Sequence, residues 1–367
     1  MIVKFTNFPK EFKILKKELI QKFNKIGSKG HYILGEELKK FETNIQKFLK
    51  VKHVLGVGNW TEGTVMVLKA LGYKRGDEII TVSNSFIATC GAIAYEGLVP
   101  KLVDIGDDLN IDVKKIEKKI NKKTKAIMPV HLSGIPSDLD KLNKICKKKR
   151  LHLIEDAAHA FGTKYKNNYI GTIGDVGIFS LHPRKSFHVL GDGGLIVTNN
   201  TELYKKILLL RNHGLKNREE SLIWGTNSRL DNLQAGFGNI MLKKISSWNK
   251  KQLKIAIKYS NNLDKKLKTP IFNLKISNPT FHQYIVRTKY RDDLKKFLKK
   301  NKIDTAIHYP IPIHKQIAYK KKFGNIKLPL TEKFSKEILS LPINPYMTED
   351  EVDFVIKKVN EFFAIKK

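Results

Sequence analysis

The feature that most constrains this chain is a regular alternation between short apolar runs and stretches of helical periodicity. Between the apolar runs, helices are expected after Thr61, around residues 87–95, after a possible cap at Asp112, and after a capping-box pattern at Ser137 and Asp140. The expected strands cover residues 53–57, 78–82, 101–104, 126–130 and 151–155. This order predicts parallel strands joined by right-handed crossovers, and therefore an α/β sheet covered by helices on both faces.

The pattern changes after residue 175. Short strands are expected at 176–180 and 194–198 around a polar, glycine-rich loop, and a long helical region begins at 233–248. From residue 269 onward we expect a loop, a strand at 284–287, a helix at 292–301, a strand at 306–309, a proline-rich loop and two terminal helices. The predicted domains are a large α/β domain, 1–245, and a smaller C-terminal α+β domain, 246–367.

The chain of 367 residues is strongly basic, with 69 Lys and Arg against 35 Asp and Glu and a formal charge of +34. The lysines are spread along amphipathic stretches, as in KKIEKKINKK, where Ile116 and Ile120 keep a helical spacing. This distribution favours solvated helix faces over a nucleic-acid site and remains compatible with phosphate-bearing small molecules.

No apolar run approaches a membrane span, and the N-terminal residues lack the pattern of a secretory signal. We therefore expect a cytoplasmic protein that binds neither membrane nor nucleic acid. Cys90 and Cys146 lack metal-ligand spacing, so no metal site is expected.

Ligands of open α/β sheets bind beyond the carboxyl ends of the strands, which makes the residues after each strand the candidates for chemistry. Residues 58–62 enter a helix whose N–H groups suit a phosphate, although small-residue turns before helices are common. Phe86 follows the next strand and is either a core side chain or a platform for a ring.

Two further strand ends carry charged side chains. Glu155 and Asp156 end an apolar strand and are followed by small residues, as a cationic ring nitrogen would require, or Asp156 is simply the cap of the next helix. Lys185 lies in a loop bounded by glycines that permit close backbone approach. Most lysines are solvated, so Lys185 alone does not identify a catalytic group.

Together these segments resemble the DegT/DnrJ/EryC1/StrS sugar aminotransferases, which are fold type I enzymes that use pyridoxal 5'-phosphate. The resemblance covers almost the entire chain. It rests on residues 30–35, 59–63, 83–89, 155–159, 179–194 and 227–235, and on His308, Tyr309, Pro310 and His314. It implies a large, mostly parallel sheet domain covered by helices, followed by a smaller α+β domain.

The resemblance also implies roles for the matching residues. Lys185 would form the internal Schiff base with the cofactor, and Asp156 would pair with the pyridinium nitrogen. His159 would lie against the ring near its phenolic oxygen, and Phe86 would stack on the ring face. These roles make Lys185 and Asp156 the expected catalytic residues.

The phosphate and the substrate would be held by further matching residues. The implied phosphate contacts are Trp60, Thr61, Ser180 and, from the neighbouring subunit of a homodimer, Asn227. The implied substrate residues are His308, Tyr309 and His314, although Tyr309 and one histidine could equally pack the domain junction. Trp60 stands where the family usually has glycine, and His159 stands where glutamine is frequent.

The activity implied is transfer of an amino group from glutamate to a nucleotide-linked keto-sugar, in aminosugar and surface polysaccharide biosynthesis. Some members carry histidine in place of the Schiff-base lysine and catalyse a dehydration, so Lys185 favours transamination. The alternatives are a sugar dehydratase, an aminotransferase of a non-nucleotide keto-sugar, and, outside enzymes, a regulatory protein that binds pyridoxal phosphate. The regulatory protein is disfavoured because no helix-turn-helix region can be distinguished within the α/β pattern.

Overall fold

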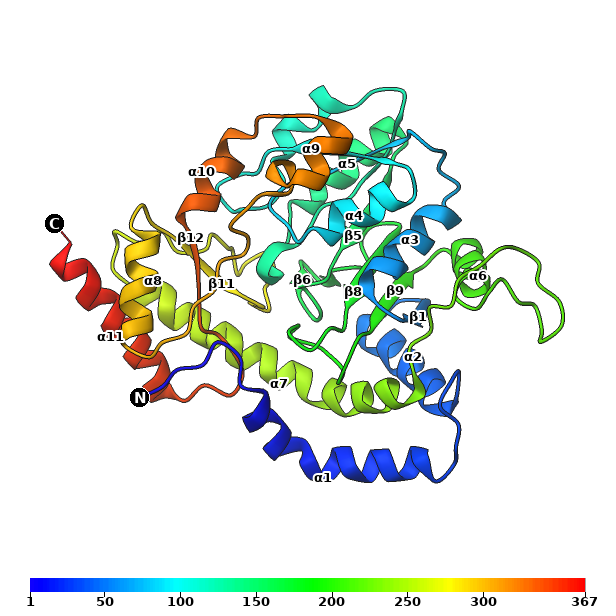
Figure 1. Ribbon diagram of the computed structural model, residues 1–367, viewed down its shortest axis with the longest axis horizontal. Coiled ribbons are helices and arrows are strands. Elements are labelled where there is room, and N and C mark those ends of the chain that lie inside the picture. Colours follow the sequence, from blue (N-terminus) through cyan, green and yellow to red (C-terminus); the bar gives the residue numbers. More distant parts are fainter. Residues whose placement is uncertain (367) are drawn as a thin grey trace.

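A seven-stranded sheet forms the centre of the protein, whose computed structural model describes residues 1–366 (Figure 1). Its strand order is β1-β9-β8-β5-β4-β2-β3. The strands are β1 (His53–Val57), β2 (Glu78–Val82), β3 (Val99–Val103), β4 (Thr124–Ile127), β5 (His152–Asp156), β8 (Val176–Ser180) and β9 (Gly194–Thr198). Only β9 runs against the others, because it follows β8 through a loop and not through a crossover helix. The expected mostly parallel sheet is confirmed.

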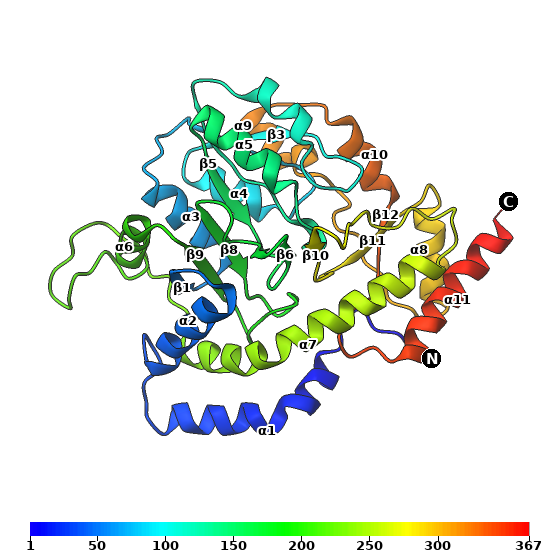
Figure 2. The same cartoon turned by 180° about the vertical axis from the view of Figure 1, so that it is seen from behind.

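Helices cover both faces of this sheet, and alternating strand residues face opposite layers. Leu55, Ile154 and Ile178 pack with α3 (Trp60–Ala70), α4 (Ala88–Tyr95) and α6 (Thr201–Leu210). Val54 and Leu153 pack on the other side. The helices there are α2 (Glu36–Leu49), α5 (Leu139–Lys149) and α7 (Asn232–Asn262), and α1 (Phe8–Gly27) lies along the outside of α7 (Figure 2). The two-residue period of the strands therefore produces two apolar layers.

A second core lies at the far end of α7. It surrounds the antiparallel pair β11 (Tyr284–Arg287) and β12 (Ile338–Leu341), with α8 (Arg291–Lys300) and α11 (Glu349–Ile365) packed against it. Val3 from the N-terminus also belongs to this core. The boundary expected after residue 245 lies inside α7, between Ile245 in the first core and Ile255 in the second, and it stays a prediction.

Two shorter helices connect the second core back to the large sheet. Tyr319 of α9 (Ile317–Phe323) packs against Cys90 of α4 and Leu102 of β3, and α10 (Pro329–Glu337) follows. A small antiparallel sheet of β10 (Ser277–Asn278), β6 (Lys164–Tyr165) and β7 (Asn168–Tyr169) lies beside the large one. The residues between 313 and 331 border the carboxyl ends of β2 and β3, because the Ile313 N–H donates to the Ser83 carbonyl and the Thr331 N–H donates to Asp104.

Five details of the predicted elements are wrong. Residues 113–119 form two short 3-10 turns instead of a helix. The cap of α5 is Asp138, which accepts the N–H of Lys141. The predicted strand 306–309 is reduced to a single bridge at Ala306, and the sequence reading missed β12 and counted two terminal helices where α9, α10 and α11 stand.

Candidate active site

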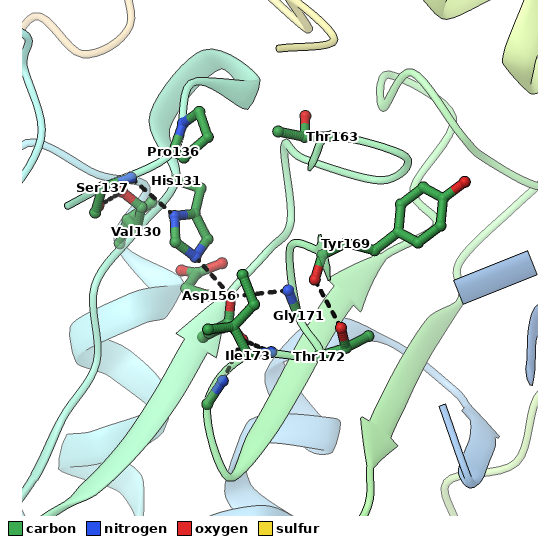
Figure 3. Close-up of polar contacts among 12 residues, drawn as sticks. Val130, His131, Pro136, Ser137, Asp156, Thr163, Tyr169, Gly171, Thr172 and Ile173 are labelled. Atoms are coloured by element: carbon green, nitrogen blue, oxygen red, sulfur yellow. Dashed lines mark hydrogen bonds and ion pairs between the residues drawn. The ribbon is translucent and has the colours of Figure 1, made fainter. Parts of the chain in front are cut away.

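The end of β5 is fixed by a buried network around Glu155. The His131 ring accepts the N–H of Ser137 at Nδ1 (3.1 Å), so its Nε2 carries the proton donated to Glu155 (3.1 Å). The Glu155 carboxylate also accepts three backbone N–H groups at 2.7–2.8 Å, from Gly171, Ile173 and Gly174 (Figure 3). A buried carboxylate satisfied in this way holds its strand end in place, and with it the adjacent Asp156.

Asp156 is the last residue of β5, and its side chain is buried. It accepts hydrogen bonds from the Thr89 hydroxyl (3.1 Å) and the Ala158 N–H (3.2 Å). Burial raises the pKa of Asp156 to about 6, opposed by the Ala158 hydrogen bond and the charge of Lys185. The carboxylate is therefore mainly ionised at pH 7. A turn and not a helix follows it, so its alternative interpretation as a helix cap is wrong.

Lys185 lies in the connection between β8 and β9. Its N–H donates to the carbonyl of His182 (2.8 Å), and its own carbonyl contacts Nδ1 of His188 (2.9 Å). Burial lowers the pKa of Lys185 to about 8, while the charge of Asp156 acts in the opposite direction. About a tenth of the amine is then neutral at pH 7. The fold brings the expected lysine and the expected carboxylate within electrostatic reach of each other.

The N-terminus of α3 offers free backbone donors. The side chain of Asn59 accepts the N–H of Glu62 (2.9 Å), and the N–H groups of Trp60 and Thr61 precede the first intrahelical bond. The indole of Trp60 points into the apolar layer between α3 and the sheet, and within residues 1–366 its Nε1 has no hydrogen-bond partner. Residue 60 therefore offers its backbone, and its bulk is kept out of the space in front of the helix.

Ser180 lies close to this helix end. It pairs with Gly194 in the β8–β9 ladder, and Gly194 packs against the start of α3. A Cβ atom at Gly194 would lie 2.7 Å from the carbonyl carbon of Asn59 and 3.0 Å from the nitrogen of Trp60. Glycine is required for this approach, which places the Ser180 strand end next to the α3 donors. Such an arrangement of N–H and hydroxyl donors fits a phosphate group.

His159 lies in the turn after β5 and is buried. Its Nδ1 accepts the N–H of Ser133 (3.3 Å), and its ring packs on that of His282 with centroids 4.5 Å apart. Burial and the charge of Lys185 hold the pKa of His159 well below its usual value. The ring is therefore neutral with its proton on Nε2, as a hydrogen bond to an anionic oxygen requires.

Phe86, His308 and Tyr309 border the same space. Phe86 is 57% exposed, which excludes the core alternative, and its ring lies 6.0 Å from that of Tyr309. Burial and the charge of Lys185 lower the pKa of His308 to about 4. Burial and the charge of Asp156 raise the pKa of Tyr309. His308 therefore lies within electrostatic range of Lys185, and Tyr309 within electrostatic range of Asp156.

His314 and Asn227 are less directly connected to this space. His314 is buried, and its two ring nitrogens contact the Ser83 hydroxyl (2.7 Å) and Glu332 (3.1 Å), which fastens the loop after β2 to α10. Asn227 is exposed in the segment between α6 and α7. The substrate role of His314 and the contribution of Asn227 to a neighbouring subunit stay predictions.

A cavity of about 340 Å³ opens beside Lys185, a volume typical of small-molecule sites. It lies between the N-terminal segment, the lysine loop and the second core. Its walls include Glu11, Arg184, Lys185, Trp248, His282 and His308. Sequence reasoning missed Glu11, Trp248 and His282, because none of them follows a strand of the large sheet. Arg184 was not predicted either, although its position next to the expected catalytic Lys185 could have indicated it.

No group of three or more His, Cys, Asp or Glu side chains within residues 1–366 is arranged to hold a metal ion. No helix in this part of the chain is long and apolar enough to span a membrane.

The large mixed sheet, the lysine between β8 and β9 and the carboxylate at the end of β5 define a fold type I transferase, the fold of the solved structures that this chain matches. Residues 13–360 match the sequence profile of the DegT/DnrJ/EryC1/StrS aminotransferase family, and the chain belongs to that family.

Named relatives cover nearly all of the chain. It is 38% identical to the dTDP-3-amino-3,6-dideoxy-alpha-D-galactopyranose transaminase of Aneurinibacillus thermoaerophilus, over 94% of this chain and 95% of the relative. It is 36% identical to a pleiotropic regulatory protein of Geobacillus stearothermophilus, over 99% of both. Among solved structures, S. venezuelae DesV in complex with a ketimine intermediate has a TM-score of 0.95 at 34% identity, with 98% of both chains covered.

Proposed function

We propose that this protein binds pyridoxal 5'-phosphate and transfers an amino group from glutamate to a nucleotide-linked keto-sugar. The observation that carries this proposal is that Lys185, whose pKa is lowered to about 8, lies within electrostatic range of the buried and mainly ionised Asp156. A lysine poised near neutrality beside a fixed carboxylate is what a covalent cofactor site needs at physiological pH.

The surrounding residues fit the phosphate and the ring of this cofactor. The N–H groups of Trp60 and Thr61 and the hydroxyl of Ser180 would hold the phosphate, with Asn227 of a second subunit reaching the same group. The exposed ring of Phe86 would cover one face of the cofactor. His159 would donate from Nε2 to the phenolic oxygen. The site then requires a homodimer to be complete.

Each residue has a defined task in the reaction. Bound cofactor supplies an electron sink for negative charge at the substrate carbon. Asp156 would keep the ring nitrogen protonated, since its ionised oxygen accepts that proton's hydrogen bond. Lys185 would hold the cofactor at rest and, once released, move a proton to and from the substrate carbon through its partly neutral Nζ.

The substrate assignment draws on the relatives and on charge. The transaminase relatives are named for dTDP-linked and UDP-linked sugars. The formal charge of +34 suits an anionic nucleotide diphosphate. His308 lines the cavity and would contact the sugar, as would Tyr309 beside Phe86, while His314 would act through the loop that carries Ser83.

We also propose the division into domains at residues 1–245 and 246–367. It is supported by the two apolar cores that α7 connects, with Ile245 in one and Ile255 in the other. Relative motion of the two parts would open and close the cavity beside Lys185.

A second candidate is a regulatory protein that binds the same cofactor without turnover. It is favoured by one observation, the similarity to the pleiotropic regulatory protein of Geobacillus stearothermophilus. A half-reaction separates the two candidates. Purified protein loaded with pyridoxal 5'-phosphate should change its visible absorbance on addition of glutamate and release 2-oxoglutarate.

The half-reaction has a direct control. Lys185→Ala should show neither the absorbance of the wild-type protein nor release of 2-oxoglutarate. Reverse reactions with a panel of nucleotide-linked aminosugars then identify the acceptor. Cofactor binding without any donor-dependent change in the wild-type protein would refute transamination and favour the regulatory candidate.

A further inference from the structure

A buried hydrogen-bonded pair of side chains, His188 and Glu11, lies behind the lysine loop. Nε2 of His188 is 2.9 Å from Oε1 of Glu11, and the Tyr346 hydroxyl donates to Oε2 of Glu11 (3.0 Å). Glu11 is 6% exposed and His188 is 3% exposed. The second ring nitrogen of His188, Nδ1, contacts the carbonyl of Lys185 at 2.9 Å. The pair thus connects helix α1 and the segment before α11 to the backbone of Lys185.

The contacts determine where the protons lie. The carbonyl of Lys185 can only accept, so Nδ1 of His188 must donate to it. The contact between Nε2 and the Glu11 carboxylate fixes the orientation of the ring and directs Nδ1 at the Lys185 carbonyl. The ring of Phe8 also lies near the imidazole, with centroids 6.4 Å apart, and His182 and His282 lie within electrostatic range of it.

We propose that Glu11 and His188 form a positioning pair that holds the backbone of Lys185 so that its amine stays in the desolvated site; this rests on the proposed function of Lys185. The Tyr346 hydroxyl orients Glu11, and Glu11 orients the imidazole of His188. His188 in turn donates a hydrogen bond to the Lys185 carbonyl. The pair acts through Lys185 and does not contact the reacting atoms.

The pair has a measurable effect on the amine. Burial is the main cause of the lowered pKa of Lys185, and burial depends on the loop being held against its surroundings. Release of the carbonyl lets the loop shift and water reach Nζ. The pKa of Lys185 should then rise from about 8 toward the ordinary value of 10.5.

Four variants separate positioning from a general loss of structure. His188→Phe removes the side chain that holds the Lys185 carbonyl, and Glu11→Ala removes the carboxylate that orients the His188 imidazole. Glu11→Gln is the conservative variant, because the amide can donate to Nε2 of His188 and so leave the proton on Nδ1. Glu37→Ala is the matched control: Glu37 pairs with Lys22 (2.8 Å) and also anchors α1, but far from the lysine loop along that helix.

The first measurement is made on cofactor-free protein. Acetylation of Lys185 by acetic anhydride is followed by mass spectrometry across a pH series. The wild-type, Glu11→Gln and Glu37→Ala proteins should show a midpoint near the same pH, and His188→Phe and Glu11→Ala should show a midpoint at least one pH unit higher. Folding of each variant is checked by circular dichroism.

The second measurement uses the loaded enzyme. In His188→Phe and Glu11→Ala, kcat should fall about tenfold to a hundredfold with KM nearly unchanged, as expected when a reacting group is displaced by about 1 Å. An unchanged acetylation midpoint in folded His188→Phe would overturn the proposal, as would equal losses in Glu11→Gln and Glu11→Ala. Wild-type protein that binds no cofactor would refute the proposed function instead, and the acetylation result would still decide the role of the pair.

Discussion

Replacing Lys185 by methionine should make the cofactor-free protein more stable at neutral pH. Burial lowers the pKa of Lys185 from 10.5 to about 8, so the folded state disfavours the charged amine relative to the unfolded chain. That difference corresponds to about 3 kcal/mol in the free energy of unfolding. The cost is fully present below pH 8, where both states are charged, and it disappears as the pH rises through 10.5, where both are neutral. Methionine fills similar space without the charge.

The test is urea unfolding of the cofactor-free wild-type and Lys185→Met proteins at pH 7 and pH 10. The variant should be more stable by about 3 kcal/mol at pH 7, and the advantage should shrink strongly at pH 10. Lys118→Met, at an exposed position, should change the free energy of unfolding by less than about 0.5 kcal/mol at either pH. A wild-type protein as stable as Lys185→Met at pH 7, or an advantage independent of pH, would refute the assignment of Lys185 as a desolvated amine.

Three further substitutions test the rest of the site. Asp156→Asn should lower kcat about a hundredfold or more while cofactor titration still shows binding through the phosphate, and unchanged kcat would contradict the role of the carboxylate. Gly194→Ala should weaken cofactor binding at least about tenfold, since its Cβ would lie 2.7 Å from the carbonyl carbon of Asn59; equal affinity in a titration would show that the α3 N-terminus is not the phosphate site. Glu155→Gln should destabilise the fold by roughly 3–5 kcal/mol in urea unfolding, because it breaks a buried network, and a stable variant would argue against that network as the support of Asp156.

Much of the fold can be predicted from the sequence, because the apolar runs and helical periods that indicate its strands and helices are local. Residues 53–57, 78–82, 176–180, 194–198 and 284–287 were predicted as strands with the bounds that the structure has. The alternation of strands and helices also predicted the parallel arrangement. The misses occur where tertiary contacts decide: β12 exists because it pairs with β11, and a four-residue apolar run has no periodicity of its own.

The residues of the candidate site also fall into two groups, those that local sequence signals predict and those that only the folded chain brings together. Asp156, Ser180 and Lys185 follow strands of the large sheet, so the strand-end rule found them. Glu11 and His282 come from distant segments that only the folded chain brings to the cavity. His314 matched a family motif, yet the structure uses both of its ring nitrogens to join Ser83 and Glu332.

The most direct test of the account is to locate the cofactor on the chain. Wild-type protein loaded with pyridoxal 5'-phosphate is reduced with borohydride, digested and analysed by mass spectrometry. The account predicts one phosphopyridoxyl group, on Lys185, and none in the Lys185→Met protein treated in parallel. A phosphopyridoxyl group on another lysine, or on none, would contradict the central role given to Lys185.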